Sequence, residues 1–326
     1  MLEQLLRNDG LSYTNILPQV RGKSKLSIVT SLLRRSWAML PILLKTKPDL
    51  LVGTDATIAQ LGRLLNIDRI TTTEDDYEVI KSLGDLAYPF TQTILCPQVC
   101  SVGKWDRKKV GYPGYMKLGY LHPNVFRVEE EVPERYGLPE RFLLVRLAQL
   151  SAHHDFGIKG ISPALLDKII SVAEARQYKV YISSEGKLDD AYLPYQLSIN
   201  PNDMHQVLAH ASALVCDSQS MTMEAAMLGT PSLRYSDFAG RISVLEELEN
   251  EYRLTQGIPT GNDTRLLARL EELLNTPDLR KEYQTRRNKM LADKIDVTAF
   301  LVWFLENYPS SKTTLLKQPS YYSRFK

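Results

Sequence analysis

The sequence predicts an α/β protein whose strands are parallel and whose helices cover both faces of its sheets. Short β-rich runs alternate with helical runs along the chain, and this alternation occurs in two series. A stretch rich in proline and charge, residues 121–140, separates the two series. A length of 326 residues is sufficient for two domains of ordinary size.

The first series opens with an expected helix over residues 1–8 and a strand over 12–17. Further strands are expected at 50–52, 70–72 and 93–95, with a helix over 56–65. The second series is expected to contain strands at 142–145, 178–182, 213–215 and 232–234, and helices at 163–176 and 204–211. Each series is typical of a Rossmann-like domain, and ligands of such domains bind at the carboxyl ends of the strands.

These patterns predict four segments. Residues 1–120 form a Rossmann-like amino-terminal domain, 121–140 a linker, 141–308 a nucleotide-binding Rossmann-like domain, and 309–326 a flexible polar tail. A doubly wound domain normally begins with a strand whose outgoing loop borders the ligand. Because this chain begins with a helical pattern instead, we expect the amino-terminal domain to lack its first strands.

Composition excludes several classes of protein. A formal net charge of +2 gives no reason to expect nucleic-acid binding. The three cysteines, Cys96, Cys100 and Cys216, are too few for a disulfide scaffold, and no second pair completes a zinc site. Charged residues interrupt the first apolar positions, so no secretory signal is visible. We therefore expect a cytoplasmic protein with no required metal.

Residues 21–47 carry seven basic residues and no acidic one, and their apolar positions recur at near-helical spacing. One interpretation is a basic amphipathic surface that rests on an anionic membrane, near a lipid-linked acceptor. The other, which the sequence favours, is a domain helix whose apolar face lies in the core. The uninterrupted apolar run, residues 37–44, is too short to span a bilayer. Peripheral membrane contact through 21–47 is therefore left open.

The most informative motif is CDSQSMTMEAA at 216–226, followed by Gly229-Thr230-Pro231. An apolar run precedes it and a helical pattern follows, so Ser218 and Ser220 are expected at a strand-to-helix turn. Free N–H groups and the helix dipole favour a phosphate there. Glu224 lies farther along the same helix, where a carboxylate can accept hydrogen bonds from the paired hydroxyls of a sugar. The alternative is serine capping of an ordinary helix.

Further segments, together with this motif, indicate a family. They are KPDLLVG at 47–53, FLLVR at 142–146, HHDFGIKGIS at 153–162 and YISSEG at 181–186. With these segments the chain resembles the domain-of-unknown-function 354 family, whose members look like GT-B proteins related to UDP-GlcNAc 2-epimerases. The resemblance implies two Rossmann-like domains with parallel sheets that face a cleft.

The epimerases carry a serine-glycine-glycine turn and a later double glutamate, which bind UDP. Ser218 matches the serine, Gln219 and Ser220 replace the glycines, and Glu224 keeps the second glutamate. The resemblance therefore implies that Ser218 and Ser220 face the phosphate oxygens and that Glu224 holds the ribose; Met221 is a further candidate for nucleotide binding. Loss of the glycines argues against a very close backbone approach, although side-chain hydroxyls could compensate.

Other candidates follow the strands of the second domain. His153 and His154 lie in the loop where, by resemblance, the epimerases place a catalytic histidine; the alternative is a capping or surface pair. Two cations, Lys159 and Arg146, are candidates for binding the diphosphate, and Arg146 could instead form a salt bridge. Residues Glu185 and Gly186 are expected in a turn that contacts the nucleotide, or in an ordinary loop.

Three carboxylates follow strands of the first domain. Asp55 and Glu74 match, by resemblance, two catalytic acids of the epimerases, the match at Glu74 being loose. Asp76 lies beside Glu74, and one of the three is expected to act as a base on an acceptor hydroxyl or a sugar carbon. Capping of a helix is the alternative for Asp55.

Together these features predict a glycosyltransferase that uses a UDP-sugar in the synthesis of a surface polysaccharide or glycolipid. The UDP-sugar is the substrate, and no separate cofactor is expected. The alternatives are an isomerase like the UDP-GlcNAc 2-epimerases and a non-catalytic protein that binds the nucleotide-sugar. The expected partners are the nucleotide-sugar and a lipid-linked or polysaccharide acceptor, and the sequence leaves a homodimer open.

Overall fold

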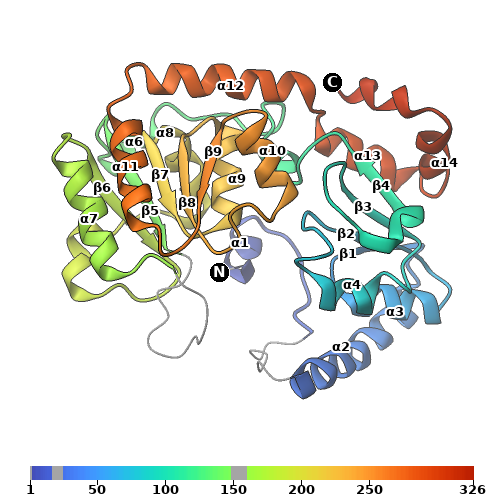
Figure 1. The fold of residues 1–326 in the computed structure, drawn as a ribbon. Helices are drawn as coiled ribbons and strands as arrows, with labels where there is room; N and C mark the ends of the chain where they lie inside the picture. Colours follow the sequence, from blue (N-terminus) through green and yellow to red (C-terminus); the bar gives the residue numbers. More distant parts are fainter. Residues whose placement is uncertain (1, 17–24, 148–159) are drawn as a thin grey trace. The chain divides into compact units, whose positions relative to one another are not determined.

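The computed structural model describes residues 2–16, 25–147 and 160–326. The chain divides into two compact units, an amino-terminal unit (Met1–Tyr112) and a carboxyl-terminal unit (Pro113–Lys326). Each unit contains one parallel sheet with helices (Figure 1). This confirms the predicted α/β class with two parallel sheets. The division at Tyr112 precedes the segment 121–140, which was expected to be the linker.

The amino-terminal unit contains a four-stranded sheet in the order β1-β2-β3-β4. All of its strand pairs are parallel, with Val52 opposite Ile70 and Leu95 opposite Val110. Its elements are α1 (Leu2–Asn8), α2 (Lys25–Thr46), β1 (Leu50–Gly53), α3 (Ala56–Leu64), β2 (Asp68–Thr72), α4 (Lys81–Ala87), β3 (Thr93–Pro97), η1 (Gly103–Lys108) and β4 (Lys109–Tyr112).

The strand expected over residues 12–17 is a wrong prediction for the part that the structure describes, since residues 11–16 form no strand. Tyr13 and Ile16 have high β-propensity, but propensity produces a strand only where a neighbouring strand offers hydrogen-bond partners. The expected helix over residues 1–8 is present as α1. The helix α2 packs on α3, and its Leu43 joins Leu51 and Leu61 in a small core.

The carboxyl-terminal unit contains a five-stranded parallel sheet in the order β6-β5-β7-β8-β9. Its elements up to the last strand are α5 (Leu118–Leu121), α6 (Val132–Tyr136), β5 (Phe142–Leu147), α7 (Pro163–Glu174), β6 (Lys179–Ser184), η2 (Asp190–Tyr195), η3 (Pro201–Asp203), α8 (Met204–His210), β7 (Ala213–Cys216), α9 (Gln219–Leu228), β8 (Ser232–Tyr235), α10 (Ser243–Asn250) and β9 (Thr255–Ile258). Four helices follow: α11 (Asp263–Leu274), α12 (Leu279–Asp293), α13 (Val297–Glu306) and α14 (Ser310–Lys317), with the turn η4 (Pro319–Phe325) at the end.

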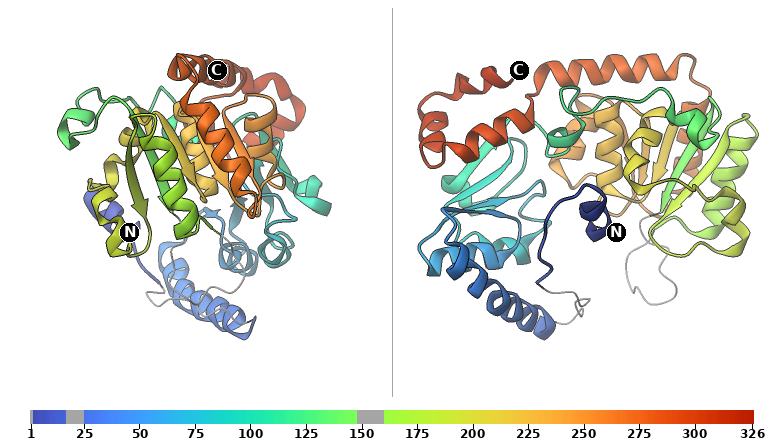
Figure 2. Two further views of the ribbon diagram at one scale, coloured as in Figure 1. Left: turned by 60° about the vertical axis from the view of Figure 1, so that its left-hand side comes forward. Right: turned by 180° about the vertical axis from the view of Figure 1, so that it is seen from behind.

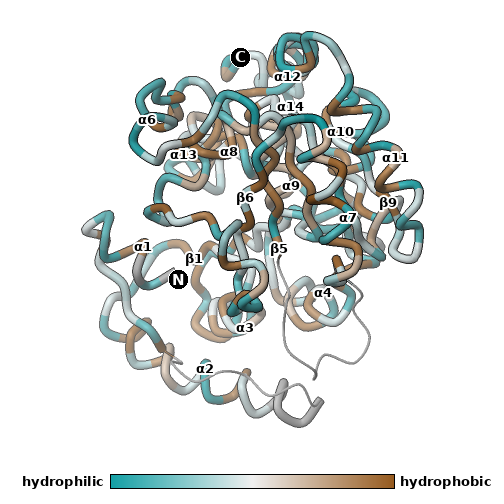
Figure 3. The backbone as a smooth tube through the Cα atoms, turned by 90° about the vertical axis from the view of Figure 1, so that its left-hand side faces the viewer, coloured by the Kyte–Doolittle hydropathy of each residue, from teal (hydrophilic) through white to brown (hydrophobic). Residues whose placement is uncertain are grey.

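Alternate residues of the strands of this sheet face two different layers of helices. On one side α7 and α11 lie side by side over the sheet, as Figure 2 shows. The residues of this core include Leu143, Val145, Val180, Ile182, Val215, Leu233, Leu166, Ile169, Leu266 and Leu270. On the other side α9 packs on β7 and β8, and α8 and α10 pack on α9. Hydrophobic residues gather along the strands, whereas α12 is largely hydrophilic (Figure 3).

The last residues of the chain, 309–326, were expected to be a flexible tail, and the structure has helical turns there. Ser311 and Leu315 of α14 are buried, and the hydroxyl of Ser311 donates to the carbonyl oxygen of Phe304 at 2.7 Å. Within η4, Tyr321 stacks on Trp303 with ring centroids 4.6 Å apart. Aromatic packing therefore fixes this segment to α13.

The helix α9 is held at both ends. Its first residue follows Ser218, whose hydroxyl oxygen accepts a hydrogen bond from the amide of Met221 at 3.3 Å. At its carboxyl end, Gly229 has a left-handed φ of 73°. The side chain of Gln284 on α12 donates to the carbonyl oxygen of Leu228 at 2.8 Å, and Arg287 donates to that of Met227. Four residues outside the helix thus satisfy its terminal groups.

We expect Gly229→Ala to destabilise the fold more than Gly240→Ala. Both glycines have a left-handed φ, which costs another residue about 1–2 kcal/mol. At Gly229 an added Cβ would also lie 2.5 Å from the side-chain nitrogen of Gln284, whereas at Gly240 it would meet nothing within 4 Å. Urea unfolding of both variants measures the difference. Equal losses of unfolding free energy would show that the contact between Gly229 and α12 is not tight.

Candidate functional site

The order of the five strands creates a switch point at the carboxyl ends of β5 and β7, the position at which open α/β sheets have their ligand crevice. From β5 the chain moves outward to β6 and then crosses back to β7 on the other side of β5. The loops that leave β5 and β7 therefore diverge, and ligands of open α/β sheets bind at such a switch point. Arg146 of β5 and Cys216 of β7 are paired in register there. The motif at 216–226 begins at this position.

The turn from β7 into α9 presents the amino end of a helix at the crevice. Ser218 has an extended backbone, with φ −102° and ψ 126°, and caps the helix. The hydroxyl of Thr222 donates to the carbonyl oxygen of Ser218 at 2.7 Å, which fixes the turn from inside. Gln219 and Ser220 belong to the first turn, whose N–H groups have no acceptor within the helix. The turn can therefore donate hydrogen bonds to an anion.

Ser220 and Met221, which were both predicted to bind the nucleotide, differ in the polar groups that they expose. Ser220 is exposed, so its hydroxyl is accessible together with its amide. Met221 is 7 % exposed, so its side chain belongs to the core and contributes no polar group. The side chain of Gln219 donates to the hydroxyl of Ser236 at 3.0 Å and ties α9 to the loop after β8.

Glu224 is buried beside a cluster of three partly exposed rings, those of Tyr120, His205 and Phe126. Its carboxylate accepts a hydrogen bond from the hydroxyl of Tyr120 at 2.7 Å, and Nε2 of His205 lies 3.5 Å from its other oxygen. The ring of Tyr120 is 5.4 Å from that of His205, and Phe126 meets His205 edge-on at 6.4 Å. The cluster therefore joins α5, α8 and α9. Helix α8 connects the parallel strands β6 and β7, so it runs back in the direction opposite to theirs. It therefore begins near the carboxyl ends of the strands.

The environment of Glu224 keeps it ionised. Burial alone would raise the pKa of this carboxyl group, because it removes water from the charged form. The hydrogen bond and charge of His205, the hydrogen bond of Tyr120 and the charge of Lys117 together outweigh burial and lower the pKa below its ordinary value. An ionised carboxylate with unused lone pairs can accept hydrogen bonds from ligand hydroxyls.

Arg146 is held by hydrogen bonds near the carboxyl ends of β5 and β6. Its guanidinium donates to the hydroxyl of Ser183 at 2.7 Å and to the carboxylate of Glu185 at 2.9 Å. Its side chain is only 11 % exposed, and its Nε is buried without a hydrogen-bond partner among the described residues. The salt bridge that the sequence left open for Arg146 is thus present. The turn at Gly186 is closed by a bond from its amide to Ser184 at 3.1 Å.

The three carboxylates of the amino-terminal unit lie in loops that follow strands of its sheet. Asp55 caps α3 by accepting from the amide of Thr57 at 2.8 Å, and it forms a close ion pair with Arg35. Asp76 is 4 % exposed and accepts from the amide of Ser101 at 2.7 Å, so it braces two loops. Glu74 is half-buried in the same loop.

Three candidates, His153, His154 and Lys159, lie outside the described residues. In the described parts, no group of three or more histidine, cysteine, aspartate and glutamate residues is placed to hold a metal ion. All three cysteines are buried thiols. Burial raises the pKa of Cys216 to about 11 and that of Cys96 to about 12, so neither supplies a thiolate nucleophile.

Sequence reasoning missed the partners of Glu224. Neither His205 nor Tyr120 is among the candidates that the sequence indicated. Both contact Glu224 through tertiary folding, and no spacing in the sequence indicates it. It also missed Arg234, which is 1 % exposed on β8 and pairs in register with Cys216. Its Nε and Nη1 have no hydrogen-bond partner in the described parts of the chain.

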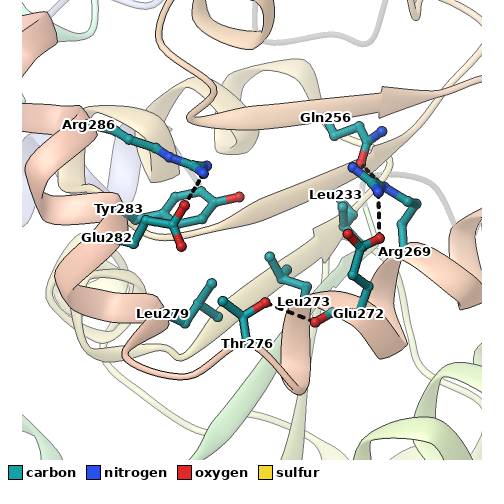
Figure 4. A pocket seen from close by; sticks show the side chains of 10 residues that line it. All are labelled: Leu233, Gln256, Arg269, Glu272, Leu273, Thr276, Leu279, Glu282, Tyr283 and Arg286. Atoms are coloured by element: carbon teal, nitrogen blue, oxygen red, sulfur yellow. Dashed lines mark hydrogen bonds and ion pairs between the residues drawn. The ribbon is translucent and has the colours of Figure 1, made fainter.

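Two cavities of the carboxyl-terminal unit lie away from this crevice. One, of about 240 Å³, is shown in Figure 4. Its two arginines, Arg269 and Arg286, are each paired with a glutamate of the same pocket, Glu272 and Glu282, so its charge is balanced. The other, of about 460 Å³, includes Arg141 and Ser212 at the amino ends of strands, opposite the edge that binds ligands in such sheets.

Solved structures of two kinds of enzyme share the fold of this chain. The UDP-GlcNAc 2-epimerase of Methanocaldococcus jannaschii matches with a TM-score of 0.59 and 14% identity, over 88% of this chain and 88% of that chain. The structure of S. aureus MnaA with UDP matches with a TM-score of 0.64 and 13% identity, over 95% of this chain and 87% of that one. The calicheamicin glycosyltransferase CalG4 matches with a TM-score of 0.55 and 15% identity, over 94% and 89%.

At these identities the similarity shows the GT-B fold alone. No protein-family model matches the chain, and no curated protein is similar to it in sequence. Membership of the domain-of-unknown-function 354 family therefore stays a prediction.

We expect Glu224→Gln to flatten the acid side of the stability profile. The folded pKa of Glu224 is lowered, so its ionised form stabilises the fold fully above the unfolded pKa, and this contribution is lost as pH falls through the folded pKa. The variant cannot titrate at this position, so its free energy of unfolding should fall less between about pH 5 and pH 3. Urea unfolding across that range measures both slopes. Identical slopes would contradict a lowered pKa at Glu224.

Proposed function

We propose that this protein is a nucleotide-sugar-dependent glycosyltransferase that uses a UDP-sugar to build a surface polysaccharide or glycolipid. The observation that carries the proposal is the amino end of α9 at the switch point of the sheet, with the ionised Glu224 on the same helix. The GT-B fold supports it, because UDP is bound in the MnaA structure and UDP-GlcNAc with UDP in one of the M. jannaschii epimerase.

The diphosphate is proposed to bind the first turn of α9. The amides of Gln219 and Ser220 and the exposed hydroxyl of Ser220 would donate to its oxygens. The hydroxyl oxygen of Ser218 accepts from Met221, which leaves its proton to donate to the ligand. Arg146 lies one strand away and adds positive charge, although Glu185 neutralises part of it.

The nucleoside is proposed to bind at the cluster around Glu224. The paired hydroxyls of a ribose would donate to the carboxylate, which Tyr120 and His205 already orient. Tyr120 is 40% exposed, and His205 and Phe126 are half-buried, so their rings are accessible to a flat base. Stacking of a base on such rings contributes about 1–3 kcal/mol.

The catalytic roles are proposed for the histidines and carboxylates that follow strands in the sequence. His153 or His154 is proposed to stabilise the leaving diphosphate. Among the carboxylates, the burial of Asp76 and its bond to Ser101 favour a structural role. Asp55 and Glu74 are more exposed, so one of them is proposed as the base that activates an acceptor hydroxyl, and Asp55 would have to leave its ion pair with Arg35 to act as that base.

A second candidate is epimerisation at C2 of the sugar, because two structures of the M. jannaschii UDP-GlcNAc 2-epimerase share this fold. The same acids would then remove and return a proton. A third is binding of the nucleotide-sugar without catalysis. The three functions share the nucleotide site and differ in what happens to the sugar.

We expect Glu224→Ala to weaken UDP binding by about 1.5–3 kcal/mol, because a charge-assisted hydrogen bond to the ribose is lost. Isothermal calorimetry with UDP measures this change. Glu247→Ala is the matched control, since Glu247 also accepts from a tyrosine hydroxyl, that of Tyr115, and pairs with a cation, Lys294 at 2.8 Å. The control should bind UDP as the wild type does. Unchanged affinity in Glu224→Ala would remove Glu224 from the nucleotide site.

Transfer and epimerisation give different products from the same UDP-sugar. For a transferase we expect UDP release that depends on an added acceptor, with no exchange of the proton at C2. For an epimerase we expect that proton to exchange with solvent deuterium when no acceptor is present. Mass spectrometry of the sugar and a UDP assay distinguish these outcomes. Binding of UDP without either reaction would support the non-catalytic alternative.

A further inference from the structure

Helix α2 carries a wide apolar face, and only one side of this face is covered. Leu43 is 4 % exposed in the small core with Leu51 and Leu61, and Met39 and Leu40 pack against that core. The covered face accounts for the favoured interpretation of this segment as a domain helix. It leaves a second set of large side chains on α2 unexplained.

The uncovered set is Leu33, Trp37 and Leu44, which are 54%, 76% and 56% exposed. Their spacings of four and seven residues place them on one line along the helix. Such a line of three large exposed side chains differs from the isolated exposed leucine that is normal on protein surfaces. Brown and teal both occur along α2 in Figure 3, which reflects its mixture of hydrophobic and hydrophilic residues.

Positive charge borders this line. Arg34 and Lys45 are both exposed, and each directly follows a residue of the line. The helix contains no acidic residue, and Lys47 is exposed just after its end. Arg35 differs from these cations, because it forms a close ion pair with Asp55. The exposed surface of α2 therefore combines apolar side chains with cations.

We propose that the uncovered face of α2, formed by Leu33, Trp37 and Leu44 with Arg34 and Lys45, docks the protein on an anionic lipid bilayer. A helix of this composition lies in the plane of the interface, with its apolar side chains among the acyl chains and its cations at the headgroups. Tryptophan is enriched at that depth. Of the helices that the structure describes, none is both long enough and apolar enough to cross a bilayer. Docking would therefore be peripheral.

A second copy of the chain fits this face less well. A symmetric contact would place Arg34 and Lys45 of one copy against the same residues of the other, and like charges repel. Anionic lipid meets the same cations with opposite charge. The proposal does not rest on the proposed function, because it concerns only the surface of α2.

Vesicle sedimentation of the full chain tests the proposal. We expect it to sediment with vesicles of phosphatidylcholine mixed with phosphatidylglycerol, and much less with phosphatidylcholine alone. High salt should release it, since the attraction of the cations is screened. Trp37→Ser should weaken binding about tenfold by loss of buried apolar area. Arg34→Gln and Lys45→Gln should each weaken it about fivefold.

Two further variants serve as controls. Leu193→Ser removes an apolar side chain that is 47% exposed in η2, beside Asp189 and Asp190, and should bind vesicles as the wild type does. Trp37→Phe should keep most of the binding but lose the blue shift of tryptophan emission that vesicles cause. The other tryptophans, Trp105 and Trp303, are half-buried and should contribute little to that shift.

Three results would overturn the proposal. The first is no sedimentation with anionic vesicles. The second is binding that Trp37→Ser does not weaken while the variant keeps the thermal stability of the wild type. The third is a dimer in light scattering that Trp37→Ser converts to a monomer, which would make this face a contact between copies. Each result is independent of UDP binding, so failure here leaves the proposed function untouched.

Discussion

The position of α9 is the constraint on which the carboxyl-terminal unit depends. The strand β7 ends at the switch point, and after a short turn at Asp217 and Ser218 the hydrogen bonds of Ser218 start the helix. At the far end, Gly229 and two side chains of α12 fix the last turn. The helix therefore cannot slide along its axis, and its free amides stay at the edge of the sheet. A site built on such a helix is preorganised, because few groups need to move when a ligand binds.

Two glutamates of this unit, Glu224 and Glu247, make similar local contacts but lie at different positions in the fold. Glu224 and Glu247 each accept a hydrogen bond from a tyrosine hydroxyl, and each has a basic side chain nearby, His205 for one and Lys294 for the other. Burial of a carboxylate is costly unless such partners are present. The pair at Glu247 links α10 to the segment just before α13. The pair at Glu224 differs in position, because it lies on the helix that begins at the switch point. Position in the fold, more than pairing, makes Glu224 a candidate for ligand binding.

The sequence predicted most of the fold, and the errors have physical reasons. Long apolar runs identified the buried strands β5 and β7, since a strand covered on both faces is apolar throughout. The strands β4 and β9 were missed. Each lies at an edge of its sheet, and their sequences KVGY and TQGI contain glycine and polar residues that an edge tolerates. Within the site, Ser218 was predictable because a cap is a local feature. His205 was not, because its contact with Glu224 joins two helices.

The resemblance to the epimerases implies that Gln219 and Ser220 stand where those proteins have two glycines, which would change how the turn holds a diphosphate. Glycine permits the closest approach of a ligand to the backbone, because it has no Cβ. Here the side chain of Gln219 bonds to Ser236, and so belongs to the contact between α9 and the loop after β8. Ser220 is exposed, so its hydroxyl extends toward solvent beyond the backbone. The diphosphate would then lie farther from the helix axis. It would lose part of the attraction of the helix dipole and gain a hydrogen bond from the hydroxyl of Ser220. Dipole effects fall off within the first turn, whereas a hydrogen bond depends only on its own geometry. In the proposed site, this arrangement would therefore keep affinity for a diphosphate without the glycines.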